Sequence, residues 1–194
     1  MLRSQGQRAR SHAPAAAAAA LLLAALAPAH AADVSIGLND SAIELGYTSA
    51  PIGDGLEFTA GAFHKREKGK SGDIVTLGLQ LAQPAAPGVR AALGGKVYAA
   101  LNDAHDTASL ALGGQLDLTP PSLPMLHFGL QAWFAPGVTS FGASDGLRDF
   151  GASIGYEVIR NAQITVSYRS VRVDYERGAS AEQDAVLVGL KLTF

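Results

Sequence analysis

The sequence closes on the stretch Val186-Leu187-Val188-Gly189-Leu190-Lys191-Leu192-Thr193-Phe194, which alternates with a period of two. In a β-strand this period places the apolar set on one face: Val186, Val188, Leu190, Leu192 and Phe194. Apolar alternation that ends in an aromatic residue is typical of the closing strand of an outer-membrane β-barrel. We therefore predict that these five residues form a C-terminal insertion signal, with Phe194 at the bilayer interface.

The first 31 residues have the three parts of a secretory signal peptide. Arg3, Arg8 and Arg10 give a positive n-region, residues 15–27 are apolar, and Ala29-His30-Ala31 fits an A-x-A cleavage site. The apolar run is shorter than the ~20 residues that a spanning helix needs. We expect cleavage after Ala31, which divides the chain into a signal peptide, 1–31, and a mature barrel, 32–194.

The mature chain would carry twelve Lys and Arg against seventeen Asp and Glu, a net charge of −5. This balance argues against a nucleic-acid partner, which needs a basic face. The absence of cysteine excludes disulfides and thiolate metal sites. The three mature histidines are far apart, and no carboxylate cluster has the spacing of a calcium loop. We therefore expect no metal ion and no other cofactor.

After residue 31 no run of eighteen apolar residues occurs, so a helical span is excluded and a closed barrel remains. Period-two patterns predict an all-β, antiparallel transmembrane barrel of about ten strands. The predicted strands are 34–39, 41–49, 55–64, 73–82, 89–101, 106–118, 125–135, 147–158, 162–175 and 184–194. Because the first two are short, an eight-stranded barrel with a periplasmic N-terminal lead-in is the alternative.

The predicted connectors alternate in character along the chain. One set is compact and rich in proline or glycine: 50–54, 84–88, 120–124 and 159–161. The other set is more charged and often longer: 65–72, 103–106, 137–146 and 177–183. Outer-membrane barrels have short periplasmic turns and longer outer loops. We therefore expect both termini in the periplasm, and a location in the outer membrane of a Gram-negative bacterium after export.

The predicted lumenal face carries four acids and five bases: Glu44, Glu57, Arg90, Lys96, Asp117, Glu157, Arg169, Arg172 and Lys191. A nearly balanced set favours a self-neutralising charge network, because an unpaired buried ion costs several kcal/mol. A β-bulge near Arg169 and Ser170 would reset the alternation in strand 162–175 and turn both Arg169 and Arg172 inward. The alternative is that this strand leaves the membrane by Ser170.

Six segments of the chain resemble the YfaZ family of outer-membrane proteins. They are Gly78-Leu79 with the preceding strand, Gly94-Gly95-Lys96-Val97-Tyr98, Phe134-Ala135-Pro136, Gly155-Tyr156-Glu157-Val158-Ile159-Arg160, Val166-Ser167-Tyr168-Arg169 and Val188-Gly189-Leu190-Lys191-Leu192-Thr193-Phe194. The resemblance covers most of the mature chain and implies an outer-membrane barrel, with no catalytic motif and no agreed activity. The chain departs from the family pattern at Trp133-Phe134, where tyrosines cluster in relatives.

Two functions remain after these exclusions. A barrel of about ten strands is close to filled by its own side chains, which favours a structural or envelope role over a narrow solute path. An outer-membrane hydrolase acting on envelope lipid is the alternative, with a histidine base, a carboxylate and a serine at the rim. Its candidate residues are His64, His105, Asp103, Asp106, Ser71 and Ser140. Because no hydrolase signature surrounds them, we expect no catalytic residue.

The basic loop Lys65-Arg66-Glu67-Lys68-Gly69-Lys70 is the predicted contact for lipopolysaccharide. Four cations, Lys65, Arg66, Lys68 and Lys70, would meet the fixed phosphate charges just outside the membrane. The alternative is a solvated loop without a ligand. We expect a monomer whose partners are outer-membrane lipid and, during biogenesis, the barrel-assembly machinery.

Overall fold

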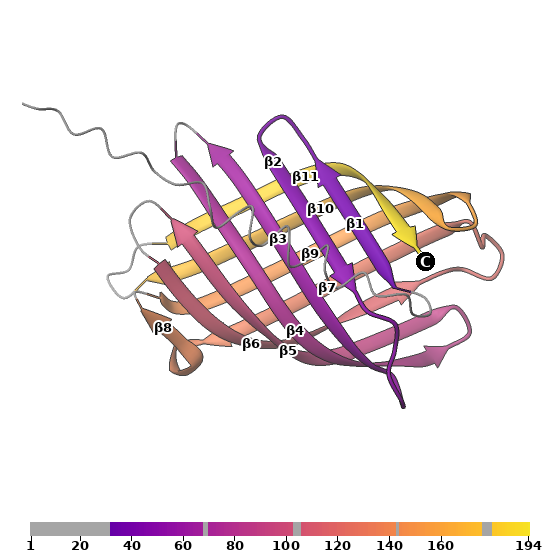
Figure 1. Cartoon of the computed structure of the whole chain (residues 1–194), viewed down its shortest axis with the longest axis horizontal. Coiled ribbons are helices and arrows are strands. Elements are labelled where there is room, and N and C mark those ends of the chain that lie inside the picture. Colours follow the sequence, from indigo (N-terminus) through magenta and orange to yellow (C-terminus); the bar gives the residue numbers. More distant parts are fainter. Residues whose placement is uncertain (1–31, 68–69, 103–105, 143, 176–179) are drawn as a thin grey trace, which may run out of the picture.

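The computed structural model describes residues 32–67, 70–102, 106–142, 144–175 and 180–194, so the predicted signal peptide lies outside the described residues. Ten antiparallel strands close into a tilted barrel (Figure 1). They are β1 (Asp33–Leu38), β2 (Ala42–Thr48), β3 (Leu56–Glu67), β4 (Lys70–Ala86), β5 (Val89–Asn102), β6 (Asp106–Leu118), β7 (Leu126–Pro136), β9 (Ser144–Ile159), β10 (Ala162–Tyr175) and β11 (Ser180–Thr193). Among the described residues, no helix is long and apolar enough to cross a membrane.

The first and last strands close the barrel. β1 pairs with β11 from Asp33 opposite Thr193 to Leu38 opposite Val188, and with β2 on its other side. The prediction of ten strands is therefore confirmed. The eight-stranded alternative is wrong, because β1 and β2 fill the wall between β11 and β3 instead of forming a lead-in.

The wall between β6 and β9 is built from two pieces. β7 pairs with the periplasmic part of β6, from Leu112 to Leu118. The chain then makes one turn of 3-10 helix, η1 (Gly137–Thr139), and continues as the short β8 (Ser140–Gly142), which pairs with Thr107–Ser109 of β6. Pro136 precedes this turn and has no N–H to donate. This suits the point where β7 stops pairing with β6.

The outer end of the barrel carries the connections β1–β2, β3–β4, β5–β6, β7–β9 and β10–β11, and we call the other end periplasmic, following the predicted orientation. Several strands run further towards the outer end than predicted. β4 begins at Lys70, β9 at Ser144 and β11 at Ser180, each three or four residues early. Cross-strand pairing continues there among polar residues, where apolar alternation no longer marks a strand.

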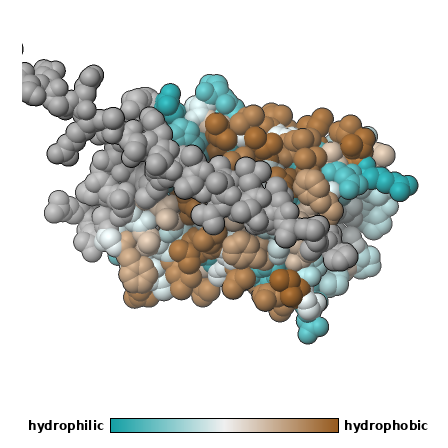
Figure 2. All heavy atoms as spheres, viewed as in Figure 1, coloured by the Kyte–Doolittle hydropathy of each residue, from teal (hydrophilic) through white to brown (hydrophobic). Residues whose placement is uncertain are grey.

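The outward faces form the apolar belt that the alternation predicted. Leu79, Leu93 and Leu112 expose 55%, 71% and 69% of their surfaces. Figure 2 shows apolar residues over the middle of the visible face and hydrophilic residues towards its right-hand end. Of the predicted insertion signal, Val186, Val188 and Phe194 are all more than half exposed.

The predicted β-bulge in β10 is absent. β10 keeps an unbroken register with β11 along its length, and its irregularities against β9 lie only at its two ends. Val171 and Val173 therefore face inward, at 1% and 4% exposure, and Arg172 faces outward. The bulge was predicted on the assumption that apolar residues always face lipid. At this height the interior is itself apolar, so the valines pack inside without any change of phase.

Candidate functional site

The outer half of the barrel interior is filled with apolar side chains. Five large ones expose 2% or less of their surface: Phe63, Ile74, Trp133, Leu147 and Val171. Each lies in the part of its strand nearer the outer end, and all belong to one buried cluster. Close packing of this kind leaves few voids wide enough for water. The interior is therefore closed over its outer half.

Glycine makes room for the largest of these side chains. Gly113 of β6 stands opposite Trp133 of β7. A Cβ at position 113 would lie 2.8 Å from Cα and 2.9 Å from Cε3 of Trp133, closer than real Cβ contacts allow. The indole can occupy the middle of the lumen because β6 has no side chain there.

Arg169 ties three strands together at mid-height. Its Nη1 lies 2.7 Å from Oε1 of Glu44 on β2, and its Nη2 lies 2.8 Å from Oδ2 of Asp149 on β9. The hydroxyl of Tyr98 on β5 donates to the same Asp149 oxygen at 2.7 Å. The Arg169 side chain is 7% exposed and that of Asp149 is fully buried. Both carboxylates are thus paired, as buried charges must be to avoid a large desolvation cost.

Lys96 supplies the second cation of this central group. Its ammonium lies 4.2 Å from the centre of the Trp133 ring, within the range of a cation–π contact. Lys96 and Arg169 together balance Glu44 and Asp149, so the central group has no net charge. Neutral, well-paired groups can stay in the middle of a barrel without water around them.

A second charge group lies near the periplasmic end. Arg90 of β5 binds Glu57 of β3 with one guanidinium nitrogen and Asp117 of β6 with the other, the latter at 2.7 Å. Gln80 donates to Glu57 at 2.9 Å. These contacts link three consecutive strand pairs, so the network stabilises the periplasmic wall.

Two further pairs lie around the same mouth of the barrel. Lys191 Nζ is 2.8 Å from Oδ2 of Asp33, which joins β11 to β1 where the barrel closes. His127 Nδ1 is 2.9 Å from the hydroxyl of Thr119, and its Nε2 is 3.6 Å from Glu157. Every one of these groups is on the inward face, at the end where both termini lie.

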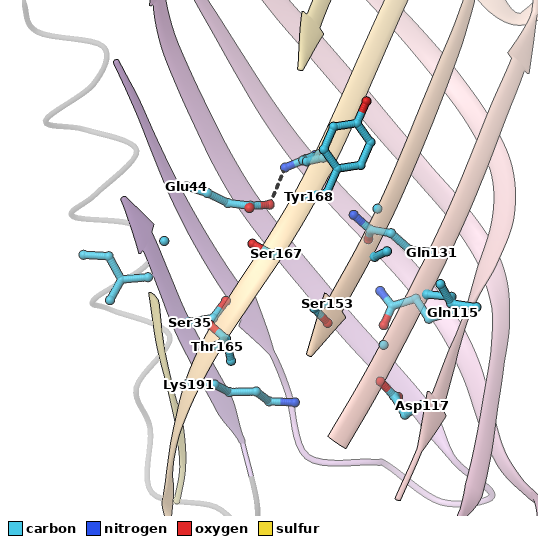
Figure 3. A pocket seen from close by; sticks show the side chains of 17 residues that line it. Ser35, Glu44, Gln115, Asp117, Gln131, Ser153, Thr165, Ser167, Tyr168 and Lys191 are labelled. Carbon is cyan, nitrogen blue, oxygen red and sulfur yellow. Dashed lines mark hydrogen bonds and ion pairs between the residues drawn. The ribbon is translucent and has the colours of Figure 1, made fainter. Parts of the chain in front are cut away.

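Between the central group and the periplasmic mouth the lumen is hollow. Two adjoining cavities of about 190 and 200 Å³ share Ser35, Glu44, Gln115, Gln131, Arg169 and Lys191 in their walls. Figure 3 shows Gln115 and Gln131 on one wall, with Lys191 and Ser35 on the other. Within the described part of the chain, neither glutamine amide has a hydrogen-bond partner. Polar side chains left in this state are normally satisfied by water.

The exposure of the charged side chains shows where this cavity opens. Asp117, Arg90 and Lys191 near the periplasmic end are 43%, 37% and 34% exposed, although all three face inward. Asp149, above them, is 0% exposed. Water therefore reaches the cavity from the periplasmic end and stops at the central group. The lumen is thus a cavity that is open at the periplasmic end and closed at the central group.

Comparison with known families identifies the chain. The YfaZ precursor family matches residues 12–194, nearly the whole sequence. The chain belongs to the YfaZ family. It is a small outer-membrane β-barrel, as its resemblance to this family predicted. No curated protein matches the YfaZ chain.

Solved porin structures share only a remote likeness with this YfaZ barrel. The outer membrane channel DcaP of Acinetobacter baumannii is 12% identical, with a TM-score of 0.45 over 79% of this chain and 51% of that one. The YfaZ chain thus spans about half the length of that channel. The KdgM porin is 12% identical over 85% of this chain and 99% of its own, with a TM-score of 0.41. The NanC porin is 7% identical over 84% and 100%, with a TM-score of 0.43.

Eight of the nine residues predicted for the lumenal network separate into four groups in the YfaZ barrel. Glu44, Arg169 and Lys96 meet at the centre, and Glu57, Arg90 and Asp117 meet near the mouth. Glu157 and Lys191 pair with His127 and Asp33 respectively. Arg172 must be removed from the set, because it lies on the outer face and pairs there with Asp174.

Sequence reasoning missed three residues of these networks. Asp149 has the lumenal phase of β9, but among the charged residues of that strand only Glu157, nearer the periplasmic end, was assigned to the lumen. Asp33 lies one residue before the predicted first strand. Tyr98 was not assigned to a face. Continuing the period-two alternation to both ends of each strand, and one residue further back to Asp33, would have placed all three side chains inside.

The predicted lipopolysaccharide loop is only partly available as a binding surface. The Lys65 side chain reaches across the barrel rim, where its Nζ donates to the backbone oxygen of Asp184 on β11 at 2.6 Å. Arg66 is exposed. Lys68 lies outside the described residues, and Lys70 begins β4.

The rim residues considered for hydrolysis are dispersed in the described part of the YfaZ barrel. His64 Nδ1 lies 2.6 Å from Oδ1 of Asp73, its cross-strand neighbour on the outward face. The hydroxyl of Ser140 bonds instead to Ser109 and to the oxygen of Pro136. Among the described residues, no serine hydroxyl is hydrogen-bonded to His64. His105 and Asp103 lie outside those residues.

Proposed function

We propose that this YfaZ barrel is a structural element of the outer membrane that provides no open path through its lumen and catalyses no reaction. The observation that carries the proposal is the closed outer half of the interior, where Phe63, Trp133 and Leu147 expose 2% or less. A solute would have to displace these side chains and break the Arg169 contacts to pass. The narrow solute path considered from the sequence is therefore disfavoured.

Planar-bilayer recording of the refolded protein tests this proposal. We expect no discrete conductance steps, with a general porin reconstituted in the same way as the positive control. Steps that depend on the amount of inserted barrel would overturn the closed-lumen function and favour the solute path.

A lipid-hydrolysis assay tests the absence of catalysis. The pairing of His64 with Asp73 on the outward face, without a bonded serine among the described residues, supports a structural role for this histidine. We expect no release of fatty acid from outer-membrane phospholipid or lipopolysaccharide. Release that is lost in the His64→Ala variant would overturn this part of the proposal.

Export and assembly complete the proposal. Residues 1–31 act as a signal peptide that is removed in a Gram-negative bacterium, and the barrel-assembly machinery inserts a monomeric chain with Phe194 last. Mass determination of the protein from isolated outer membranes tests the processing site, since cleavage after Ala31 leaves a chain that begins at Ala32. A mass that retains the first 31 residues would contradict it.

A further inference from the structure

The bilayer-facing wall of the barrel has a groove on the side formed by β5, β6, β7, β9 and β10. Its volume is about 610 Å³ and its lining is almost wholly apolar. Gly114, Ala132 and Ala152 form its shallow floor, and Leu93, Phe150 and Tyr168 stand beside it. The three larger side chains are 71%, 58% and 45% exposed, so they project from the wall and flank the groove.

The cross-strand register explains why a groove forms here. Gly114 stands opposite Ala132, and on the outward face this small pair lies between Leu93 of β5 and Phe150 of β9. The adjacent row includes Ala152 next to Tyr168. Ala91, also in the lining, is the third residue of β5 from the periplasmic end, whereas Phe150 lies in the outer half of β9. The groove therefore runs along the barrel wall from near the periplasmic end towards the outer end.

A positive charge lies beside the upper end of this groove, one outward row above the flanking Phe150. Arg148 is two residues from Phe150 on the same outward face of β9, and its register neighbours are Phe134 and Arg172. From Val158 to Arg148 the strand advances ten residues, about 25 Å along the barrel axis at the usual rise and tilt, which matches the height of the apolar band. Arg148 thus lies where the bilayer interior gives way to headgroups.

Arg148 has no ion-pair partner of its own among the described residues. Arg172, its cross-strand neighbour, already has Asp174 at 2.9 Å and faces Glu182 of β11 on its other side. Like charges directly opposite each other on a sheet are destabilising unless something offsets them. An anion beside Arg148 would do so.

We infer that this groove and Arg148 bind one phosphorylated lipid of the outer leaflet, lipid A of lipopolysaccharide, with an acyl chain along the groove and a phosphate at Arg148. An apolar groove with a guanidinium at its upper end that has no ion-pair partner among the described residues is complementary to an anionic amphiphile. Arginine binds phosphate with charge-assisted hydrogen bonds. The choice of the outer leaflet rests on the proposed orientation, with the loops outside. The site is separate from the basic loop at residues 65–70.

Native mass spectrometry of the refolded mature protein, after exchange from lipid into detergent, tests the inference. Lipid A, dephosphorylated lipid A and phosphatidylglycerol are the three probes. We expect one retained lipid A per barrel and at least about tenfold weaker retention of dephosphorylated lipid A, since a hydrogen bond to a charged group contributes enough for that ratio. Phosphatidylglycerol, which keeps a phosphate, tests the choice of lipid and should also be retained less than lipid A. Equal retention of dephosphorylated lipid A, or of phosphatidylglycerol, would overturn the assignment.

Three variants locate the site. Arg148→Gln and Ala132→Phe should each lower retention of lipid A about tenfold, the first by removing the charge and the second by filling the floor. Arg160→Gln is the matched control, because Arg160 is exposed in the turn between β9 and β10 at the opposite end and the charge change is the same. It should retain lipid A as the unmodified protein does.

Folding is monitored separately by the gel mobility shift between unheated and boiled samples. If Arg148→Gln fails to fold, Arg148→Lys provides the test, with retention of lipid A expected below that of the unmodified protein, because the planar guanidinium fork is lost. Folded Arg148 variants that retain lipid A fully would overturn the inference. Conductance is measured independently, so a lipid-binding failure leaves the closed-lumen proposal standing, and the reverse also holds.

Discussion

At the scale of single residues, two arginines of β10 have opposite roles although only three positions separate them. Arg169 is buried between Glu44 and Asp149, and Arg172 is half exposed beside Asp174 on the outer face. Removing one partner from a buried ion group leaves an uncompensated charge, whereas an exposed ion pair contributes little. The same substitution at the two positions should therefore have very different consequences.

We predict that Arg169→Met lowers the free energy of unfolding by about 3–5 kcal/mol, because Asp149 and Glu44 lose their shared partner. Arg172→Met, the matched control, should change it by at most about 1 kcal/mol. Urea titration of the refolded variants in lipid vesicles measures both. Equal losses would mean that Arg169 does not hold the central group together.

At the scale of strands, the period-two pattern predicted most of the barrel from sequence. It placed ten strands, the lumenal side chains Asp117 and Glu157, and the exposed face of β11, because lipid imposes one polarity on every outward position. It did not predict the polarity inside. Above Arg169 the interior is mainly apolar, with a few buried hydroxyls such as Thr107 and Ser109, and below it the interior is polar. Apolar side chains such as Val171 and Val173 can therefore face either lipid or the lumen.

Long-range partners were also beyond the sequence. The contact of Tyr98 with Asp149 crosses the lumen between β5 and β9, and no local spacing encodes it. Lys65 was assigned to a basic loop that contacts lipopolysaccharide, with a solvated loop as the alternative, but the staggered rim brings it to β11. The sequence thus predicted which residues share a face, while the closure and tilt of the barrel decide which of them meet.

The closing strand provides a direct test of face assignment. Leu190→Arg should abolish or strongly reduce folding, because an arginine facing lipid near the midplane costs about 2–4 kcal/mol. Lys191→Gln should cost at most about 1 kcal/mol, since Lys191 is one-third exposed and loses only its pair with Asp33. Unfolding in vesicles compares the two. A larger loss for Lys191→Gln would reverse the two faces of β11.

The β1–β2 hairpin is the shortest part of the wall and depends on one side chain. Asn39 accepts the N–H groups of Ser41 and Ala42 and donates to the oxygen of Val186 on β11. Asn39→Ala should weaken the hairpin by about 1–3 kcal/mol through these lost bonds. We expect faster hydrogen exchange in β1 and β2 than in the unmodified protein.

Hydrogen exchange read by peptide mass tests this prediction. Asn161→Ala is the control, because Asn161 donates to the oxygen of Thr193 at the opposite end of the same β11. It should leave exchange at residues 37–43 unchanged. If both variants accelerate exchange there equally, the effect belongs to β11 as a whole and not to the hairpin turn.

At the scale of the whole molecule, the interior is divided into a dry outer half and a wet periplasmic half. The natural absence of cysteine makes this division measurable with single introduced thiols. Ser153 lines the cavity in the periplasmic half, whereas Ala135 is 0% exposed in the outer half. Both side chains face inward. The two positions therefore differ in access to water but not in the face of the wall.

We predict that Ser153→Cys reacts with a small charged methanethiosulfonate reagent in the folded barrel, while Ala135→Cys reacts only after denaturation. Ser122→Cys, in the exposed turn before β7, gives the unhindered rate. Mass spectrometry of the labelled proteins compares the three. Rapid labelling of Ala135→Cys would mean that water fills the lumen from end to end.

The closed outer half also bears on how many copies a cell can tolerate. Each open channel added to an outer membrane raises the leakage of small toxic molecules, so the number of open channels trades against protection. A barrel that stops water at Arg169 and Asp149 carries no such penalty. In the proposed structural role, the abundance of the barrel is therefore not limited by permeability.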